Sequence, residues 1–407
     1  MATHGIRVRD GRPVANVHVH LPPNFSAFDT VEDAVRTAAA EGISVIGGSN
    51  FHDHRVYARL AAAAQVAGII PLFGCEIITL AEDLRDQCIK VNDPDNAGRF
   101  YVCGKGLNAL GEPTEIATGL REHARAVNTE RMQQMIPLMR ECFARAGLET
   151  DLTEETITGT VAARADVPRE WVVLQERHVA LAFQEAVFLA VGPDQRPGLL
   201  ARAFGGPTGV DAEDPIAVSG EIRHRLMKAG RPAFVPESPV MFEDGYRFVL
   251  ESDGIPCYTT VADGASPVSA WEDGPTELAE RILAKGFHLA ELIPNRNDPA
   301  VVDAYVRTWR DAGIIVTAGT EHNTRVRIPL EPVCVDRSPL TDAVWSTVWE
   351  GTCVVTAHQN LRARGEPGYV DRDGRLNPGF PDADTRIRWF AEMGDELIRG
   401  AAVGVPG

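Results

Sequence analysis

The chain has 407 residues, of which 44% are hydrophobic and 24% are charged, the balance of a globular protein that can bury a large core. Its formal net charge of −17 would repel anionic surfaces, so we expect neither nucleic acid nor membrane as a partner. No apolar run approaches the roughly 20 residues of a membrane span. The segment Met1–Arg7 lacks the apolar core of a secretory signal, so we expect a cytoplasmic protein. The seven cysteines form no C-x-x-C pair, which predicts reduced thiols.

The first part of the chain alternates short apolar segments with helical ones. We expect four strands, at 14–20, 43–47, 69–73 and 100–106, and two helices, at 29–41 and 56–67. A β-α-β-α-β series of this kind predicts parallel strands joined by right-handed crossovers. One α/β barrel with insertions accommodates a chain of this length.

The middle of the chain breaks this alternation before it resumes. Residues 121–190 have helical periodicity, and the Pro- and Gly-rich segment 192–245 predicts a long loop with one helix near 216–229. Further strands are expected at 255–260, 288–293 and 314–318, with helices at 275–285 and 299–312. The apolar run 353–355 predicts a strand or a helix end, and 383–399 a closing helix. We therefore divide the chain into a first half-barrel at 1–120, a helical insertion and loop cover at 121–250, a second half-barrel at 251–362, and a C-terminal linker and helix at 363–407.

Ionisable residues follow several of the expected strands. His18 and His20 stand one residue apart at the end of the first strand, and alternation along a strand places both on one face, about 7 Å apart. An isolated pair of this kind is more often a solvated polar pair than a metal site. However, later strands end in His52-Asp53-His54, in Gly74-Cys75-Glu76 and in Glu321-His322. Because functional residues gather at the carboxyl ends of barrel strands, the series predicts a site.

In this order the motifs resemble those of the polymerase-and-histidinol-phosphatase (PHP) family of metal-dependent hydrolases. The segment Leu174–Ala180 is also similar to that family's insertion. The resemblance implies a distorted seven-stranded (β/α) barrel with a helical insertion and a C-terminal extension. It maps four residues to one family metal site, namely His18, His20, Glu76 and Glu321. Other family ligand positions differ: Ser49-Asn50-Phe51 stands in place of Thr-Asp-His, and Tyr101 and Thr260 stand in place of histidines.

Two imidazoles with one or two carboxylates can hold zinc, manganese or iron and leave positions open for water and substrate. A divalent metal ion is therefore the expected cofactor. Four further residues are candidates for a second metal or for acid-base catalysis: His52, Asp53, His54 and His322. Lys105, Arg325 and Arg327 are candidates for binding an anionic group, although solvated surface positions are the more common role for such arginines. His358 is a weaker candidate for the site.

The leading hypothesis is a metal-dependent hydrolase of a small, anionic molecule, most plausibly a phosphoesterase. A second hypothesis is an amidohydrolase-like or lyase-type metal enzyme, because H-x-H after the first strand with Lys105 after the fourth also resembles that barrel. A third is a degenerate barrel that binds metal or ligand without turnover. Measured activity on phosphate esters, lactones and amides distinguishes the three.

Overall fold

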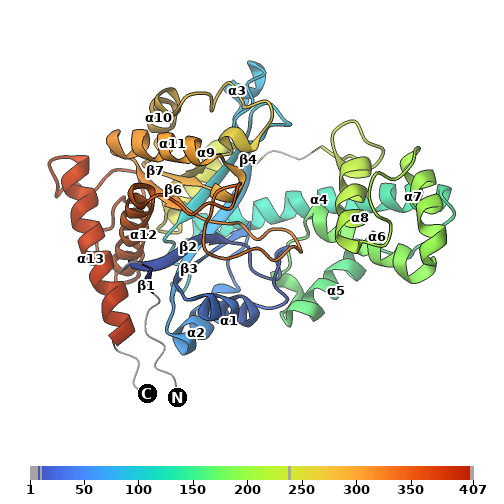
Figure 1. Ribbon diagram of the computed structural model, residues 1–407, viewed down its shortest axis with the longest axis horizontal. Helices are drawn as coiled ribbons and strands as arrows, with labels where there is room; N and C mark the ends of the chain where they lie inside the picture. Colours follow the sequence, from blue (N-terminus) through green and yellow to red (C-terminus); the bar gives the residue numbers. More distant parts are fainter. Residues whose placement is uncertain (1–7, 10–11, 237–239, 404–407) are drawn as a thin grey trace.

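The computed structural model describes residues 8–9, 12–236 and 240–403, so the segment expected to lack a secretory signal lies outside the described residues. Its centre is a barrel of seven strands in sequential order (Figure 1). The strands are β2 (Arg12–Val19), β3 (Ile43–Phe51), β4 (Ile70–Leu80), β5 (Arg99–Lys105), β6 (Ile255–Thr259), β7 (Leu289–Leu292) and β8 (Ile315–Ala318). A two-residue strand, β1 (Val8–Arg9), extends the sheet by pairing antiparallel with β2. The distorted (β/α) barrel expected from the sequence is the observed fold.

The barrel closes between its first strand and the segment that follows its last. His20 N donates to Glu321 O at 2.7 Å, and Glu321 N donates to His18 O at 2.8 Å. Val19 and Glu321 form a parallel bridge at the same place. The two ends of the barrel sequence therefore meet at the expected H-x-H motif.

One strand runs against the prediction of a parallel sheet. β5 is antiparallel to both β4 and β6, whereas the other neighbouring barrel strands are parallel. The connection from β4 to β5 contains only the short helix α3 (Glu82–Asp86), which cannot return the chain along the barrel for a parallel crossover. As a result, the carboxyl end of β5 lies at the opposite end of the barrel from those of β2, β3 and β4.

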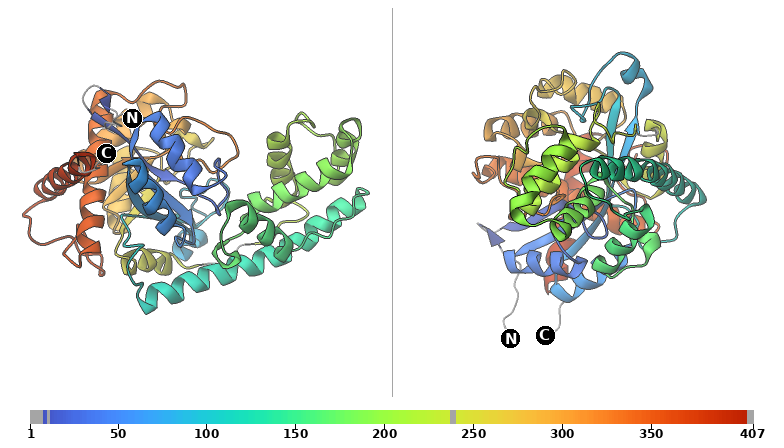
Figure 2. Two further views of the ribbon diagram at one scale, coloured as in Figure 1. Left: turned by 90° about the horizontal axis from the view of Figure 1, so that it is seen from below. Right: turned by 90° about the vertical axis from the view of Figure 1, so that its right-hand side faces the viewer.

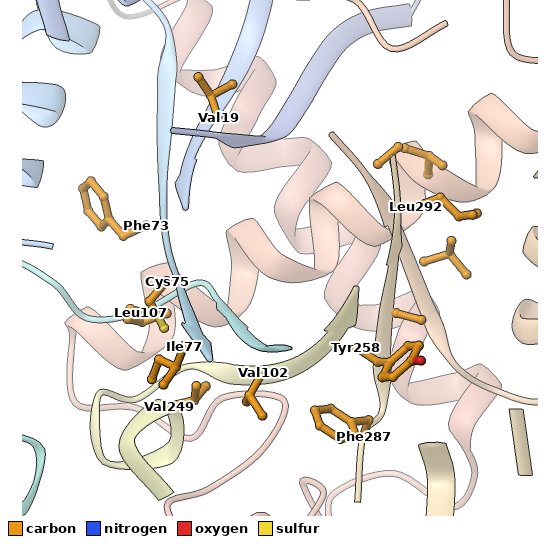
Figure 3. Packing of buried hydrophobic residues seen from close by; sticks show 14 of the residues in the cluster. Val19, Phe73, Cys75, Ile77, Val102, Leu107, Val249, Tyr258, Phe287 and Leu292 are labelled. Carbon is orange, nitrogen blue, oxygen red and sulfur yellow. The ribbon is translucent and has the colours of Figure 1, made fainter. Parts of the chain in front are cut away.

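Helices cover the outside of the barrel, and their apolar faces pack on the strands. The helices are α1 (Val31–Glu41), α2 (Tyr57–Ala67), α9 (Phe242–Glu251), α10 (Pro275–Ala284) and α11 (Pro299–Asp311). Thr30 caps α1 by accepting a hydrogen bond from Asp33 N, as its position before the apolar pattern predicts. Figure 3 shows part of this apolar layer, in which Phe287 lies near Val102 and meets Tyr258 edge to face.

A second group of helices stands to one side of the barrel (Figure 2). It consists of α4 (Glu115–Arg145), α5 (Glu154–Ala165), α6 (Glu176–Ala190), α7 (Arg196–Phe204) and α8 (Pro215–Ile222), and it encloses its own apolar core. The expected helix near 216–229 corresponds to α8 and the turn Arg223–Met227, but the long loop expected around it at 192–245 is wrong for the described part of that segment, because α7 and the start of α9 lie there as well. Pro197 lies in the first turn of α7 and Gly205 follows its end, so these residues bound a helix rather than form a loop.

The C-terminal part of the chain covers the end of the barrel at which its parallel strands begin. The run 353–355 lies inside the long helix α12 (Asp342–Ala363), so the expectation of a strand there is wrong. The run is continuously apolar because it is buried between the interior of the barrel and the last helix, α13 (Ala383–Val403). Gly351 permits this approach, since a Cβ there would lie 1.9 Å from Val316 O. Gln359 binds Pro71 O and Phe73 N at the start of β4, so α12 covers the amino end of that strand.

Short helical turns complete the described structure: Arg169–Trp171, Pro193–Gln195, Arg223–Met227, Ala262–Gly264 and Pro294–Arg296. Among the described residues, no helix has the length and apolar character needed to cross a membrane.

Candidate metal centre and its cavity

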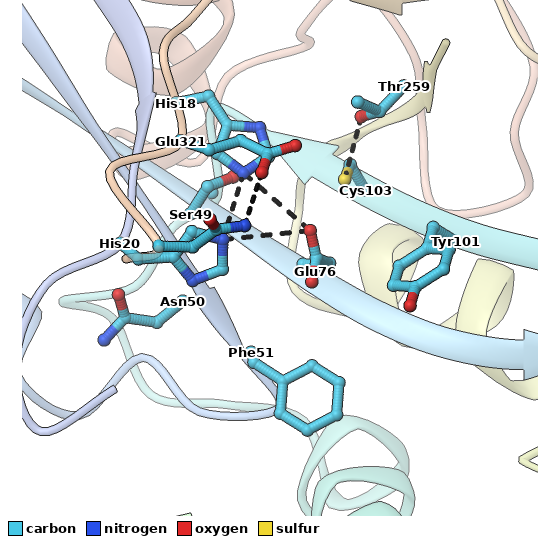
Figure 4. A network of polar contacts seen from close by, with 12 residues as sticks. His18, His20, Ser49, Asn50, Phe51, Glu76, Tyr101, Cys103, Thr259 and Glu321 are labelled. Carbon is cyan, nitrogen blue, oxygen red and sulfur yellow. Dashed lines mark hydrogen bonds and ion pairs between the residues drawn. The ribbon is translucent and has the colours of Figure 1, made fainter. Parts of the chain in front are cut away.

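Three side chains from β2 and β4 converge at the carboxyl end of the barrel (Figure 4). The Nε2 atoms of His18 and His20 are 3.4 Å apart, and each lies 3.8 Å from Glu76 Oε2. The ligand atoms of these three residues all lie within 4.8 Å of one another. Ligand atoms that share one ion through bonds of about 2 Å lie at separations of this order. The arrangement fits a single divalent cation.

The orientation of His18 is fixed from inside the barrel. Its Nδ1 lies 2.5 Å from Glu291 Oε2 on β7. Although burial raises the pKa of Glu291, Lys105 and His18 hold it below its ordinary value, so the carboxylate accepts and His18 Nδ1 donates. The other ring nitrogen, Nε2, then presents its lone pair to His20 and Glu76. A carboxylate behind a metal-binding histidine commonly sets its tautomer in this way.

The charge states of the cluster also fit a cation. Burial, together with His18, lowers the pKa of His20 to about 3, so this imidazole is neutral at pH 7. Burial and the nearby Glu321 raise the pKa of Glu76 to about 8. His20 Nδ1 is buried without a hydrogen-bond partner. A bound cation would favour the ionised form of Glu76, and imidazole nitrogens with a carboxylate are a donor set suited to zinc, manganese or iron.

Glu321 lies beside this cluster, but its oxygens have other partners. Arg296 forms two hydrogen bonds to the Glu321 carboxylate, and Asn323 Nδ2 donates to it as well. Although burial raises the pKa of Glu321, Arg296, His18 and His20 lower it below its ordinary value. Gly319 is needed for this turn to pass β2, because a Cβ there would lie 2.2 Å from His18 Cβ. These hydrogen bonds hold the Glu321 carboxylate in place beside the cluster.

His322 does not face the cluster, which corrects its assignment as a catalytic candidate. Its Nδ1 lies 2.6 Å from Thr320 Oγ1, its Nε2 lies 3.0 Å from Ile328 O, and its ring stacks on Phe28. Glu321 and His322 both have positive φ values, 62° and 51°, so the chain turns sharply after β8 rather than continuing as a strand. This turn directs His322 into the packing between the barrel and the loop.

The three consecutive candidates after β3, His52, Asp53 and His54, lie in different surroundings. Asp53 forms ion pairs with Arg55 at 2.7 Å and Arg125 at 2.6 Å, which ties it to α4 instead of a metal. His54 is buried near Phe248, and burial lowers its pKa to about 4. His52 differs, because it lines the same cavity as His20 and Glu76. Of the three, His52 is therefore placed to contact a substrate.

The anion-binding candidates lie away from this cavity. Lys105 points into the barrel, where its Nζ lies 2.8 Å from Glu291 Oε1 and 3.1 Å from Ser49 Oγ, because β5 runs antiparallel to its neighbours in the sheet. Arg325 pairs with Asp29, and Arg327 pairs with Asp33, on the outer surface. These three assignments are corrected accordingly. His358 is likewise structural, since its Nε2 lies 2.8 Å from Asp253 O and its Nδ1 accepts from Tyr369 N.

Position 50 explains why a second cluster does not form beside the first. Asn50 Oδ1 accepts from Leu21 N and Asn50 Nδ2 donates to Leu21 O, so this side chain clamps the loop that follows β2. Among the described residues, the other group with metal-ligand spacing is His18, Cys103 and Glu291. There Glu291 is paired with Lys105, and burial raises the pKa of the Cys103 thiol well above its ordinary value. That group is therefore part of the polar interior of the barrel.

A cavity of about 560 Å³ opens over the cluster, between the barrel and the helical group. This size suits a small molecule. Basic side chains line it despite the acidity of the whole chain, namely Arg99, Arg131, Arg177, Arg223, Lys228 and Arg296. Glu176 pairs with Arg131, Arg223 and Lys228, and these cations lower its pKa to about 2 even though burial opposes the shift.

Arg177 is the exception in this set. Among the described residues it has no ion pair or hydrogen bond, and burial, with the nearby Arg223, lowers its pKa to about 10. It remains charged at pH 7 and is close enough to His20 to influence the pKa of that imidazole. Arg177 lies in the segment Leu174–Ala180, where the sequence predicted no role for it, and Glu291 was not among the predicted site residues. A glutamate inside the apolar strand Leu289-Ala290-Glu291-Leu292 was the available signal for the latter.

No family model and no curated protein sequence matches the chain. Among solved structures, one from Bifidobacterium adolescentis, assigned as a metal-dependent phosphoesterase, aligns with a TM-score of 0.52 and 15% identity, covering 82% of this chain and 94% of that one. An amidohydrolase from Chromobacterium violaceum, solved with sulfate and no metal, aligns with a TM-score of 0.49 and 16% identity, covering 82% and 96%. The likeness is one of fold.

Proposed function

We infer that this protein is a divalent-metal-dependent hydrolase of a small anionic molecule, and specifically a phosphoesterase. The observation that carries this proposal is the cluster of His18, His20 and Glu76, of which His20 and Glu76 line the same cavity as Arg177. The assignment of a protein with the same fold as a metal-dependent phosphoesterase supports it. A cation site beside a fixed positive charge suits a phosphate group, whose charge is spread over several oxygens.

Each side chain has a distinct task in this proposal. His18, His20 and Glu76 hold the ion, and Glu291 keeps His18 in the required tautomer. A divalent cation bound there supplies positive charge that polarises a phosphoryl oxygen and acidifies water. Arg177 binds a second phosphoryl oxygen and orients the ester. His52 also lines the cavity, and because burial lowers its pKa to about 3 it is a neutral imidazole at pH 7 that can form a hydrogen bond with the substrate.

One of the two alternatives loses support at Lys105. The amidohydrolase-like hypothesis rested on Lys105 after the fourth strand, and Lys105 instead pairs with Glu291 inside the barrel. A barrel that binds metal without turnover would have the same ligand geometry, so only an activity assay distinguishes it from the proposed enzyme.

The test is a panel of phosphate monoesters, lactones and amides, assayed with zinc, manganese or iron and after chelation. We expect metal-dependent turnover of phosphate esters and none of neutral amides. Arg177→Met should lower kcat/KM for the phosphate ester about tenfold or more, because a hydrogen bond to a charged group contributes about 1.5–3 kcal/mol. Arg145→Met, which removes an exposed arginine on α4, is the control and should leave kcat/KM unchanged. Metal-loaded protein that hydrolyses no phosphate ester would contradict the proposal.

A further inference from the structure

A second cavity of about 760 Å³ adjoins the first. It lies between the loop that follows β2 and the helices α5, α6 and α8. Arg177 and Arg223 line both cavities, so these two side chains form a shared wall. A molecule larger than the first cavity would extend past Arg177 into the second.

The second cavity is lined mainly by apolar groups, among them Phe25, Phe28, Val161, Leu181, Ile216 and Val326. At its rim, Ile216 and Val326 are 42% and 48% exposed. Large apolar side chains exposed around a concave surface are typical of a ligand site. The walls therefore favour an apolar ligand group.

All but one of the charged side chains that line this cavity have an ion-pair partner. Arg164 pairs with Glu185 at 2.8 Å, and Arg325 pairs with Asp29 at 2.8 Å. Arg223 pairs with Glu176 at 2.9 Å. Arg177 alone of the charged residues that line the cavity lacks such a partner among the described residues. The apolar cavity thus has one guanidinium without an ion pair among the described residues, and it lies on the side of the metal-ligand cluster.

We propose that the substrate is an amphiphilic phosphate ester, whose phosphate lies between the metal-ligand cluster and Arg177 and whose apolar organic group fills the second cavity. This inference rests on the proposed function for the reaction, but binding in the second cavity does not depend on turnover. A small polar ester would leave the apolar walls exposed to water, whereas an aryl group of naphthyl size would cover them.

The test uses phosphonates, which bind like phosphate esters but are not hydrolysed. Isothermal titration should show that naphthylmethylphosphonate binds the wild-type protein at least tenfold more tightly than methylphosphonate, because each additional 55 Å² or so of buried apolar surface contributes about a factor of ten. Ser219→Trp on α8 places an indole in the second cavity and should remove about tenfold of the naphthyl affinity. It should leave methylphosphonate binding unchanged.

The matched control is Ala217→Trp, which makes a similar change on the same helix but lines a different surface hollow and should affect neither ligand. Ile216→Asn, at the exposed rim, is a second variant that does not disturb a core and should weaken naphthylmethylphosphonate alone. Equal affinity of wild-type protein for the two phosphonates, or unchanged naphthyl affinity in both Ser219→Trp and Ile216→Asn, would overturn the inference. Preference for the naphthyl ligand without hydrolysis of any ester would support this site and reject the proposed reaction.

Discussion

Replacing Lys105 by alanine is expected to destabilise the protein by about 3–5 kcal/mol, the range measured when one partner of a buried ion pair is removed. Lys105 and Glu291 are 2% and 0% exposed, and their charged atoms are 2.8 Å apart. Without Lys105, the Glu291 carboxylate would keep only His18 and Thr259 as neighbours in the barrel interior. Because domains are stable by about 5–15 kcal/mol, the loss should shift the denaturation midpoint strongly.

Two further variants show whether the effect comes from the uncompensated charge. Lys285→Ala removes a surface pair with Asp83 and should cost less than about 1 kcal/mol. The double variant Lys105→Met with Glu291→Gln removes both charges and should be clearly more stable than Lys105→Met alone, since replacing a whole buried pair is often nearly neutral. A denaturation midpoint for Lys105→Ala equal to that of the wild-type protein would contradict the assigned role of Lys105.

The alternation of strands and helices and the common face of His18 and His20 follow from local sequence features, whereas the distorted seven-stranded barrel was implied by the resemblance to the PHP family. A short apolar strand that ends in His18 and His20, with Glu76 on a later strand, specifies which residues can meet, because side-chain alternation and parallel crossovers are local rules. Thr30 and Gly42 at the two ends of α1 are equally local signals. These elements were predictable from composition and spacing.

The direction of one strand was not predictable in this way, and the assignment of Lys105 failed with it. Whether β5 runs up or down depends on how far the connection 81–98 can carry the chain, which is a property of the folded barrel. The same limit hid Arg177, whose guanidinium has no ion pair among the described residues. Neighbouring Arg223, of the same residue type, pairs with Glu176.

Replacing Glu291 by glutamine is expected to weaken binding of the divalent ion by about 10–100-fold, the usual cost of losing the group that orients a metal-binding histidine. Lys105 Nζ can only donate, so it should attract the amide oxygen of the new side chain. The amide NH₂ would then face His18 Nδ1 and force that nitrogen to accept. His18 would carry its proton on Nε2, where the lone pair for the ion is needed.

Titration of zinc or manganese into metal-free protein measures this effect without any assay of activity. His20→Ala removes a ligand outright and should lower the metal content more than Glu291→Gln does. Glu272→Gln is the matched control, because Glu272 is also buried but accepts hydrogen bonds from Tyr258 and Thr260 and lies outside the groups with metal-ligand spacing. Its metal affinity should equal that of the wild-type protein. If Glu291→Gln also kept wild-type affinity, the tautomer of His18 would not depend on β7, and the ion would have to bind through atoms other than His18 Nε2.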